Sequence, residues 1–575
     1  MNPPNRGAAR PRDVVLALVL LLAAPACTDA DEALPGGPSL MEMARALGSD
    51  VVRTLVRGYV PDRSGEIILV PKPWNVLSQW NGGYRGTGDP RTTHSTPWAY
   101  HQRVPIALYG PGYIRSGVTV DRPTSVADLA PTLAALLDIP FEARGSVLRE
   151  ALAPDRTDRP PRAIVVVVVD GGGWNVLERW PEAWPAERAL MEGGTTFTNA
   201  TIGSTPSVTA PIHATIGTGT YPSRHGITEN SLRRPDGTMG DVAYDNADMR
   251  LLEAPTVADE WDRSTGNRAW VGMLGYEGWH LGMMGSGALE PGADRDVAVL
   301  WDTETEEFWT NERYYELPPY LPTRADLDGR IEEVDGSDGA LDGMWRGNTL
   351  DPSSYEFTAG PAFAAHEGQA ALEVLRHEPI GQDRIPDLYF VEMKTGDIAG
   401  HVWNMESREF EAVWRTQDDA IGDLVELLDR RVGSGRYVIA ITADHGQTPV
   451  PEVFGGLRID RYSLRDDLEL WLGGAVESVQ PSDIFFELDA LEDTDIDAVA
   501  RYIGGLTYGD NLPEGLEPDE VPKELLDERV FAGALPGSFL ESLTDEEIDR
   551  LGPGLFPEGD LTAPPVLRAL RQTFR

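Results

Sequence analysis

Long apolar runs without polar alternation mark the predicted buried strands of this chain. One of them, residues 163–169, holds Ile164 followed by five valines and ends at Asp170. Such a run is typical of a parallel strand buried on both faces, because alternation is expected only where one face meets water. Similar runs recur at Arg268–Met273, Asp387–Met393 and Tyr437–Thr442, with helical patterns such as Glu411–Leu428 between them. Strands that alternate with helices predict an α/β/α sandwich with a mostly parallel central sheet.

The same pattern divides the chain into segments. Ahead of the valine strand lie apolar runs at Glu66–Val70 and Val104–Tyr109, and a helix at Val126–Leu137 with Ser125 as its N-cap. We expect these boundaries: a leader at 28–60 with a helical pattern around Leu40–Val56, a segment at 61–150 that completes the core, a Pro- and Arg-rich linker at 151–162, the core at 163–465 with an acidic, aromatic insert at 286–360, a smaller α+β subdomain at 466–548 with a strand at Asp483–Leu488, and a tail at 549–575.

The first 27 residues have the pattern of an export signal. Three arginines precede an apolar run at Val14–Ala24, which is short for a membrane span but suits a signal-peptide core. The run is followed by Cys27, as in a bacterial lipoprotein lipobox, and ordinary cleavage after Ala26 is the alternative. We therefore expect export, to the cell envelope as a lipoprotein anchored at Cys27, or otherwise to the periplasm or medium.

Composition excludes several classes of protein. The chain carries 49 Lys plus Arg against 93 Asp plus Glu, a formal net charge of −44. This charge repels nucleic-acid backbones and anionic lipid surfaces, so we expect neither as an extended partner. Small phosphate esters remain possible substrates, because a bound metal ion can outweigh the electric field of the net negative charge. The single cysteine, Cys27, excludes disulfides within the chain, Cys-rich zinc modules and iron–sulfur clusters.

Metal-type ligands follow three of the predicted strands. The valine strand ends at Asp170, the next ends ahead of Asp397 and His401, and the third ends ahead of Asp444 and His445. A single Asp after a strand is often a helix N-cap. Three such ends, two of them pairing Asp with His, predict a metal site at the carboxyl edge of the sheet.

A fourth candidate is Thr209, which precedes an apolar helical pattern. We expect Thr209 to cap this helix, with Pro211 in the first turn. A hydroxyl placed there faces the positive end of the helix, and beside a metal it can act as a nucleophile. A plain N-cap is the alternative for Thr209 taken alone.

Together these motifs resemble the alkaline phosphatase superfamily, specifically its nucleotide pyrophosphatase/phosphodiesterase branch. The resemblance implies two zinc ions and a phosphothreonine intermediate on Thr209. It assigns one zinc to Asp170, Thr209, Asp444 and His445, and the other to Asp397 and His401. It also implies that Asn230, which lies twenty-one residues after the nucleophile as in the family, contacts a phosphate oxygen.

The family needs one more His on the second zinc, from a segment near its C-terminus. This chain has no His after His445. Residues 92–112, with His94 and a strand ending in Tyr-Gly-Pro-Gly, resemble that missing segment. We therefore predict a circular permutation in which His94 completes the second zinc site. The alternative is a remnant of another copy, with a site that lacks this ligand.

Substrate specificity is less determined by the motifs. Monoesterase relatives hold the phosphate with a Lys-Asp-Arg group, but no Lys or Arg occurs between Arg268 and Arg295 here. His280 lies in this place and is a candidate substrate contact, with a packing role as the default interpretation. The branch stacks a base on an aromatic after its Thr, and Ala210 stands there instead. Five aromatics of the insert either line a pocket or form a small core of their own: Trp301, Trp309, Tyr314, Tyr315 and Trp345.

The leading hypothesis is a metal-dependent phosphodiesterase or nucleotide pyrophosphatase that acts on small phosphate esters. A phosphomonoesterase with the same mechanism is the first alternative. A non-catalytic surface lipoprotein on the same scaffold is the second.

Overall fold

The computed structural model describes residues 36–78, 92–154, 159–243, 248–285, 295–454, 456–511, 518 and 523–556. The predicted signal segment and Cys27 lie outside this part of the chain, as does most of the tail. No helix among the described residues has the length and apolar character needed to cross a bilayer.

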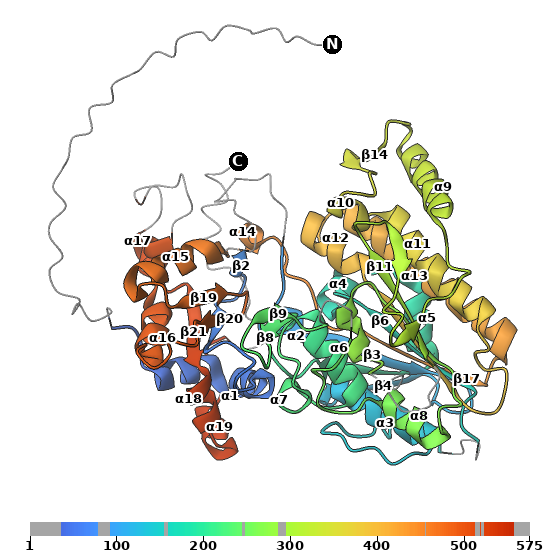
Figure 1. Cartoon of the computed structure of the whole chain (residues 1–575), viewed down its shortest axis with the longest axis horizontal. Helices are drawn as coiled ribbons and strands as arrows, with labels where there is room; N and C mark the ends of the chain where they lie inside the picture. Colours follow the sequence, from blue (N-terminus) through green and yellow to red (C-terminus); the bar gives the residue numbers. More distant parts are fainter. Residues whose placement is uncertain are drawn as a thin grey trace, which may run out of the picture. The chain divides into compact units, whose positions relative to one another are not determined.

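An eleven-stranded sheet forms the centre of the described chain (Figure 1). Five neighbouring strands, β11, β10, β16, β6 and β17, run parallel. This confirms the predicted α/β architecture with a mostly parallel sheet. In order, the main strands are β12 (Glu307–Trp309), β11 (Asp296–Asp302), β10 (Val271–Leu274), β16 (Asp387–Met393), β6 (Ala163–Val169), β17 (Tyr437–Thr442), β3 (Arg103–Tyr109), β7 (Thr195–Thr201) and β4 (Val118–Val120), with β13 (Tyr315–Glu316) on β11 and β5 (Thr124–Ser125) on β7.

The valine strand β6 contributes side chains to two hydrophobic cores. Val165, Val167 and Val169 pack into one, while Ile164 and Val166 pack into the other. Successive side chains of a strand point to opposite faces, so both faces of β6 are covered, as its unbroken apolar sequence predicts. Residues of α4 (Trp174–Arg179), α5 (Pro185–Gly193), α9 (Arg324–Asp335), α10 (Tyr355–Thr358), α11 (Pro361–His377), α12 (Thr395–Trp403) and α13 (Arg408–Leu428) join the first core. Residues of α3 (Leu129–Leu137), α6 (Thr209–Thr218), α8 (Val257–Thr265) and the 3-10 helix η2 (Gly278–Gly282) join the second.

Strand β3 is the reversed member of the central sheet. It pairs antiparallel with β17 on one side and with β7 on the other. Because it runs against the parallel strands, its first residue lies at the edge where those strands end. The carboxyl edge is therefore also where the residues that precede β3 lie, among them His94 and α2 (Ala99–Gln102).

A second, four-stranded sheet belongs to the smaller subdomain. Its order is β19 (Val476–Val479), β20 (Asp483–Phe486), β1 (Ile67–Pro71) and β21 (Phe531–Pro536). The predicted leader helix is α1 (Leu40–Gly58), and it packs against β21 (Figure 1). The remaining elements here are α15 (Arg461–Leu472), α16 (Ile496–Gly505), α17 (Lys523–Leu526), α18 (Gly537–Ser542) and α19 (Asp545–Leu551), with β2 (Val76–Ser78) on β18 (Arg458–Asp460).

Two strands pair with other parts of the protein than the segment boundaries predicted from the sequence suggest. Strand β1 lies in the segment 61–150, yet it pairs with β20 and β21 rather than with the central sheet. Strand β11 lies in the insert 286–360, yet it extends the central sheet through β10. Both strands are apolar, and an apolar pattern reports burial without naming the partner strand.

Candidate active site

The carboxyl edge of the central sheet gathers the predicted metal ligands. Asp170 follows the last residue of β6, while Asp444 and His445 follow β17 by two and three residues. Asp397 and His401 lie on α12, which begins two residues after β16. They share one face of this helix, because residues four apart are stacked along it.

His94, Asp397 and His401 form one group. Nε2 of His94 lies 3.5 Å from Oδ1 of Asp397, and Nε2 of His401 lies 3.4 Å from Oδ2. The Nδ1 atoms face backbone carbonyls, 2.6 Å from Ser207 O for His94 and 2.7 Å from Thr92 O for His401. An Nδ1–H that donates to a carbonyl leaves the Nε2 lone pair free to bind a metal ion.

Asp170, Asp444 and His445 form the second group. Nε2 of His445 lies 3.4 Å from Oδ1 of Asp170 and 3.3 Å from Oδ2 of Asp444. The imidazole rings of His445 and His94 stack with centroids 3.6 Å apart, so the two groups adjoin. Burial, with the Asp170 carboxylate beside it, raises the pKa of Asp444 well above its usual range.

The second group contains buried polar atoms that find no hydrogen-bond partner in the protein, as expected of a metal site. Oδ1 of Asp170, Oδ2 of Asp444 and Nε2 of His445 are buried and have no hydrogen-bond partner. Unpartnered polar atoms inside a protein are destabilising, and a bound cation would satisfy all three. Imidazole nitrogens with carboxylate oxygens are a donor set that suits zinc and similar divalent ions.

Thr209 begins helix α6 beside these groups. The structure corrects its predicted role as a cap, because Val208 is the N-cap residue and has no capping side chain. Its hydroxyl is instead free of the helix backbone and accepts a hydrogen bond from Lys394 Nζ at 3.2 Å. The Thr209 side chain therefore faces the ligand cluster, as a nucleophile must.

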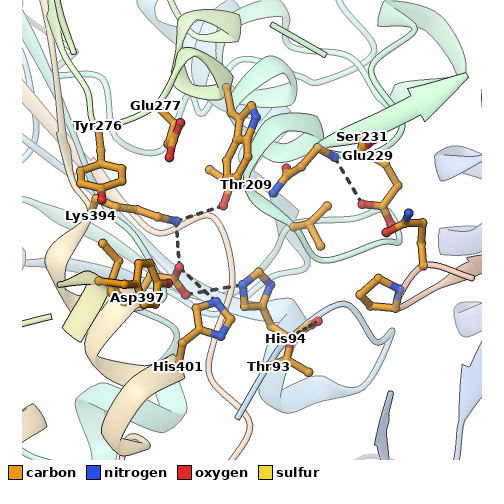
Figure 2. Close-up of a pocket in the computed structure, with 17 residues that line it drawn as sticks. Thr93, His94, Thr209, Glu229, Ser231, Tyr276, Glu277, Lys394, Asp397 and His401 are labelled. Carbon is orange, nitrogen blue, oxygen red and sulfur yellow. Dashed lines mark hydrogen bonds and ion pairs between the residues drawn. The ribbon is translucent and has the colours of Figure 1, made fainter. Parts of the chain in front are cut away.

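A pocket of about 380 Å³ opens over Thr209, and Figure 2 shows its lining. Asn230 lines the pocket, and its Oδ1 accepts a hydrogen bond from Ala210 N at 2.9 Å. Gln480 and Pro481, ahead of β20, bring the smaller subdomain to the pocket wall. Lys394 is the one Lys or Arg among the described lining residues.

His280 does not reach this pocket in the described structure. It is fully buried behind Asp170, with Nε2 3.6 Å from Asp170 Oδ2 and 3.5 Å from Oε1 of Glu392. Its ring also lies edge-on to His213, with centroids 4.8 Å apart. Asp170, His213, His280 and Glu392 place ligand atoms within 4.8 Å of one another, so this third group also has the donors to hold a cation.

The aromatics of the insert lie mainly in the protein interior. Trp301, Tyr314, Tyr315 and Trp345 are buried in the two cores, and Trp309 packs against one of them. The aromatic residues that line the pocket are instead Tyr276, Trp279 and Tyr355.

Several site residues were not singled out by the sequence analysis. Glu392 lies inside the apolar strand β16, and Gln447 Nε2 donates to Asp397 Oδ1 at 3.1 Å. A charged residue within a fully buried strand was a usable signal for Glu392. Glu229 and Glu277 line the pocket but belong to no recognisable motif.

Comparison with known proteins gives one matching family, two curated relatives and one solved structure. A family model described as type I phosphodiesterase / nucleotide pyrophosphatase matches residues 164–533. Alkaline phosphatase PhoV of Synechococcus elongatus is 25% identical over 339 residues, which cover 51% of this chain and 60% of the relative. Alkaline phosphatase PafA of Elizabethkingia meningoseptica is 23% identical over 344 residues, which cover 52% and 63%.

The chain thus spans about three fifths of the length of these two curated relatives. A crystal structure of wild-type PafA superposes with a TM-score of 0.48 at 19% identity, covering 66% of this chain and 85% of that chain.

Proposed function

Because the chain belongs to the type I phosphodiesterase / nucleotide pyrophosphatase family, within the alkaline phosphatase superfamily, we propose that it hydrolyses phosphate esters with Thr209 as nucleophile. The observation that carries this proposal is the position of the Thr209 hydroxyl. It lines the same pocket as His94, Asp397 and His401. Its partner Lys394 also contacts Asp170, whose group has buried ligand atoms without hydrogen-bond partners.

Each group of side chains has a role in the proposed reaction. Thr209 Oγ attacks phosphorus, and the ester oxygen departs with a proton as an alcohol. Water then cleaves the bond between phosphorus and Thr209 Oγ, which releases phosphate or a phosphate monoester. The backbone N–H of Thr209, in the first turn of α6, and the amide of Asn230 are placed to donate to a non-bridging oxygen.

Two divalent cations fit the ligands, and we propose zinc. His94, Asp397 and His401 would hold one, while Asp170, Asp444, His445 and Thr209 would hold the other. When bound, such ions stabilise negative charge on the attacking and departing oxygens. The ligand role of His94 rests on our further proposal that residues 61–150 occupy a circularly permuted position.

Phosphodiesters are the substrate class that the pocket charges favour. Glu229 and Glu277 contribute two carboxylates to the lining, whereas Lys394 is already paired with Asp170 and Asp397. A monoester carries up to two negative charges near neutral pH and a diester carries one. Burial raises the pKa of Glu277 to about 7 and that of Glu229 to about 8, so both carboxylates are ionised above pH 8. At such alkaline pH they disfavour the monoester more strongly than the diester.

A phosphomonoesterase of the same mechanism is the second candidate, since two relatives are named alkaline phosphatases. The unpartnered ligand atoms argue against a non-catalytic surface protein. Export, with anchoring at Cys27, completes the proposal and places the enzyme in the cell envelope.

The test compares bis(4-nitrophenyl) phosphate with 4-nitrophenyl phosphate, using zinc-loaded enzyme. We expect a higher kcat/KM for the diester. Thr209→Ala should lose at least about a thousandfold, because the covalent step disappears. Thr218→Ala, a buried change on the same helix, is the matched control and should keep its activity. Zinc-loaded wild type without activity, or full activity in Thr209→Ala, would overturn the proposal.

A further inference from the structure

Glu277 is a carboxylate in the pocket wall without a cationic partner. It follows β10 and lines the same pocket as Thr209. Among the described residues no Lys, Arg or His nitrogen forms an ion pair with its carboxylate; Lys394 lowers its pKa only from farther away. Burial and then Asp241 raise the pKa of Glu277 to about 7, so the group is ionised at alkaline pH.

Aromatic residues share the pocket lining with this carboxylate. Tyr276, Trp279 and Tyr355 line the pocket together with Glu277. Tyr355 stands at the start of α10 and is 45% exposed, which places it toward solvent. Tyr276 is buried and packs edge-on against Phe363, with centroids 5.8 Å apart.

Hydrogen bonds hold the segment that carries Glu277 and Trp279 in place. Glu277 N donates to Nδ1 of the buried His280 at 3.0 Å. Trp279 Nε1 donates to Oδ2 of Asp241 at 2.6 Å, which fixes the plane of the indole. A wall that is already ordered loses little entropy when a ligand binds.

The wall lies on one side of the proposed nucleophile, opposite the histidines of the first ligand group. Figure 2 shows Tyr276 and Glu277 on the side of Lys394 and Thr209 away from His94 and His401. A second ester group on phosphorus would therefore extend past Lys394 toward Glu277. An unpaired, partly buried carboxylate is unfavourable alone, and it is stabilised by a cation.

We infer that Glu277, Tyr276, Trp279 and Tyr355 form a subsite for a cationic ester group, and that the preferred substrates are phosphodiesters carrying an alkylammonium. Aromatic faces bind ammonium groups, quaternary ones above all, and the carboxylate adds ionic attraction. This inference rests on the proposed function, because it names the substrate class of the same site.

The experiment uses two substrates of matched shape. 4-Nitrophenyl phosphocholine carries a trimethylammonium, and 4-nitrophenyl 3,3-dimethylbutyl phosphate carries an uncharged tert-butyl group in its place. We expect wild-type kcat/KM to favour the cation by about tenfold or more, as an attraction of ~1–2 kcal/mol implies. In Glu277→Gln this ratio should fall toward one, and Trp279→Leu should lower it independently.

Glu304→Gln, an exposed change between β11 and β12, is the matched control and should keep the wild-type ratio. A wild-type ratio near one, or an unchanged ratio in Glu277→Gln, would overturn the inference. If neither substrate is hydrolysed, the proposed function fails, and calorimetric titration with choline decides the subsite separately. Choline binding that is weakened in Glu277→Gln supports the subsite, and absence of binding to wild type overturns it.

Discussion

Lys394 Nζ lies 2.8 Å from Oδ2 of Asp170, and both side chains are buried. The same ammonium lies 2.8 Å from Oδ2 of Asp397, so it links one carboxylate from each candidate metal group. Burial alone would lower the pKa of Lys394, but Asp170 and Asp397 raise it well above its usual range. The lysine is therefore a fixed positive charge at the centre of the site.

Lys394→Met should lower kcat/KM for an aryl diester by about a hundredfold or more, because it removes a preorganised donor at Thr209 Oγ. Steady-state kinetics with the zinc content measured in parallel checks this. Lys72→Met, which breaks only the partly exposed pair with Glu528, should behave as wild type. Wild-type kinetics in Lys394→Met would show that the ammonium has no part in the reaction.

His94→Ala should reduce bound zinc from two ions to one and remove most activity, because it deletes one of the three side chains in the group of His94, Asp397 and His401. Elemental analysis of the purified protein gives the metal count. His377→Ala, a half-exposed histidine of α11, serves as the control. Two retained zinc ions in His94→Ala would contradict both the ligand role of His94 and the argument for a permuted chain.

Gly171→Ala should weaken metal binding through Gln447. Gly171 has a positive φ of 73°, and a Cβ there would lie 2.1 Å from Gln447 Nε2, the atom that donates to Asp397 Oδ1. Gly112 shares the positive φ, at 88°, but a Cβ there meets nothing within 4 Å. Both Ala variants should lose ~1–2 kcal/mol of stability to backbone strain.

Titration with a zinc chelator should then separate the two glycine variants. Gly171→Ala should release zinc at lower chelator concentration than Gly112→Ala. Equal zinc affinity in both would mean that Gln447 moves aside without disturbing Asp397.

Glu187→Gln should flatten the pH dependence of stability. Burial, with Asp418 nearby, raises the pKa of Glu187 from 4.5 to about 8. The native state therefore holds a proton that the unfolded chain releases, and stability falls as the pH rises from 4.5 through 8. One pKa unit corresponds to ~1.4 kcal/mol, so the loss amounts to a few kcal/mol.

Urea midpoints of wild type and Glu187→Gln between pH 5 and 9 test this. The variant should lose less stability at high pH than wild type. Glu192→Gln, an exposed change on the same helix, should follow wild type. Parallel pH curves for wild type and Glu187→Gln would contradict the buried-carboxyl explanation.

The sequence predicted the parts of this protein that depend on local pattern. The valines of β6 correctly predicted a strand buried on both faces. The candidate ligands after β6, β16 and β17 correctly predicted a cluster at one edge of the sheet, because parallel strands end together. The partner of an apolar strand is a tertiary property, so the sequence analysis grouped β1 with the segment that completes the core and β11 with the insert. Glu277 likewise carries no sequence signature, since its importance comes from which groups it faces.

The reversed strand β3 has a consequence for how the protein is made. Thr442 Oγ1 donates to the carbonyl of Pro105, across 337 residues of chain. Strand β3 is synthesised early, but it can pair with β17 only after most of the chain is complete. Contacts this distant close large loops and slow folding. Incomplete chains consequently expose the edge of β3 that pairs with β17 in the finished sheet, and an open strand edge promotes aggregation.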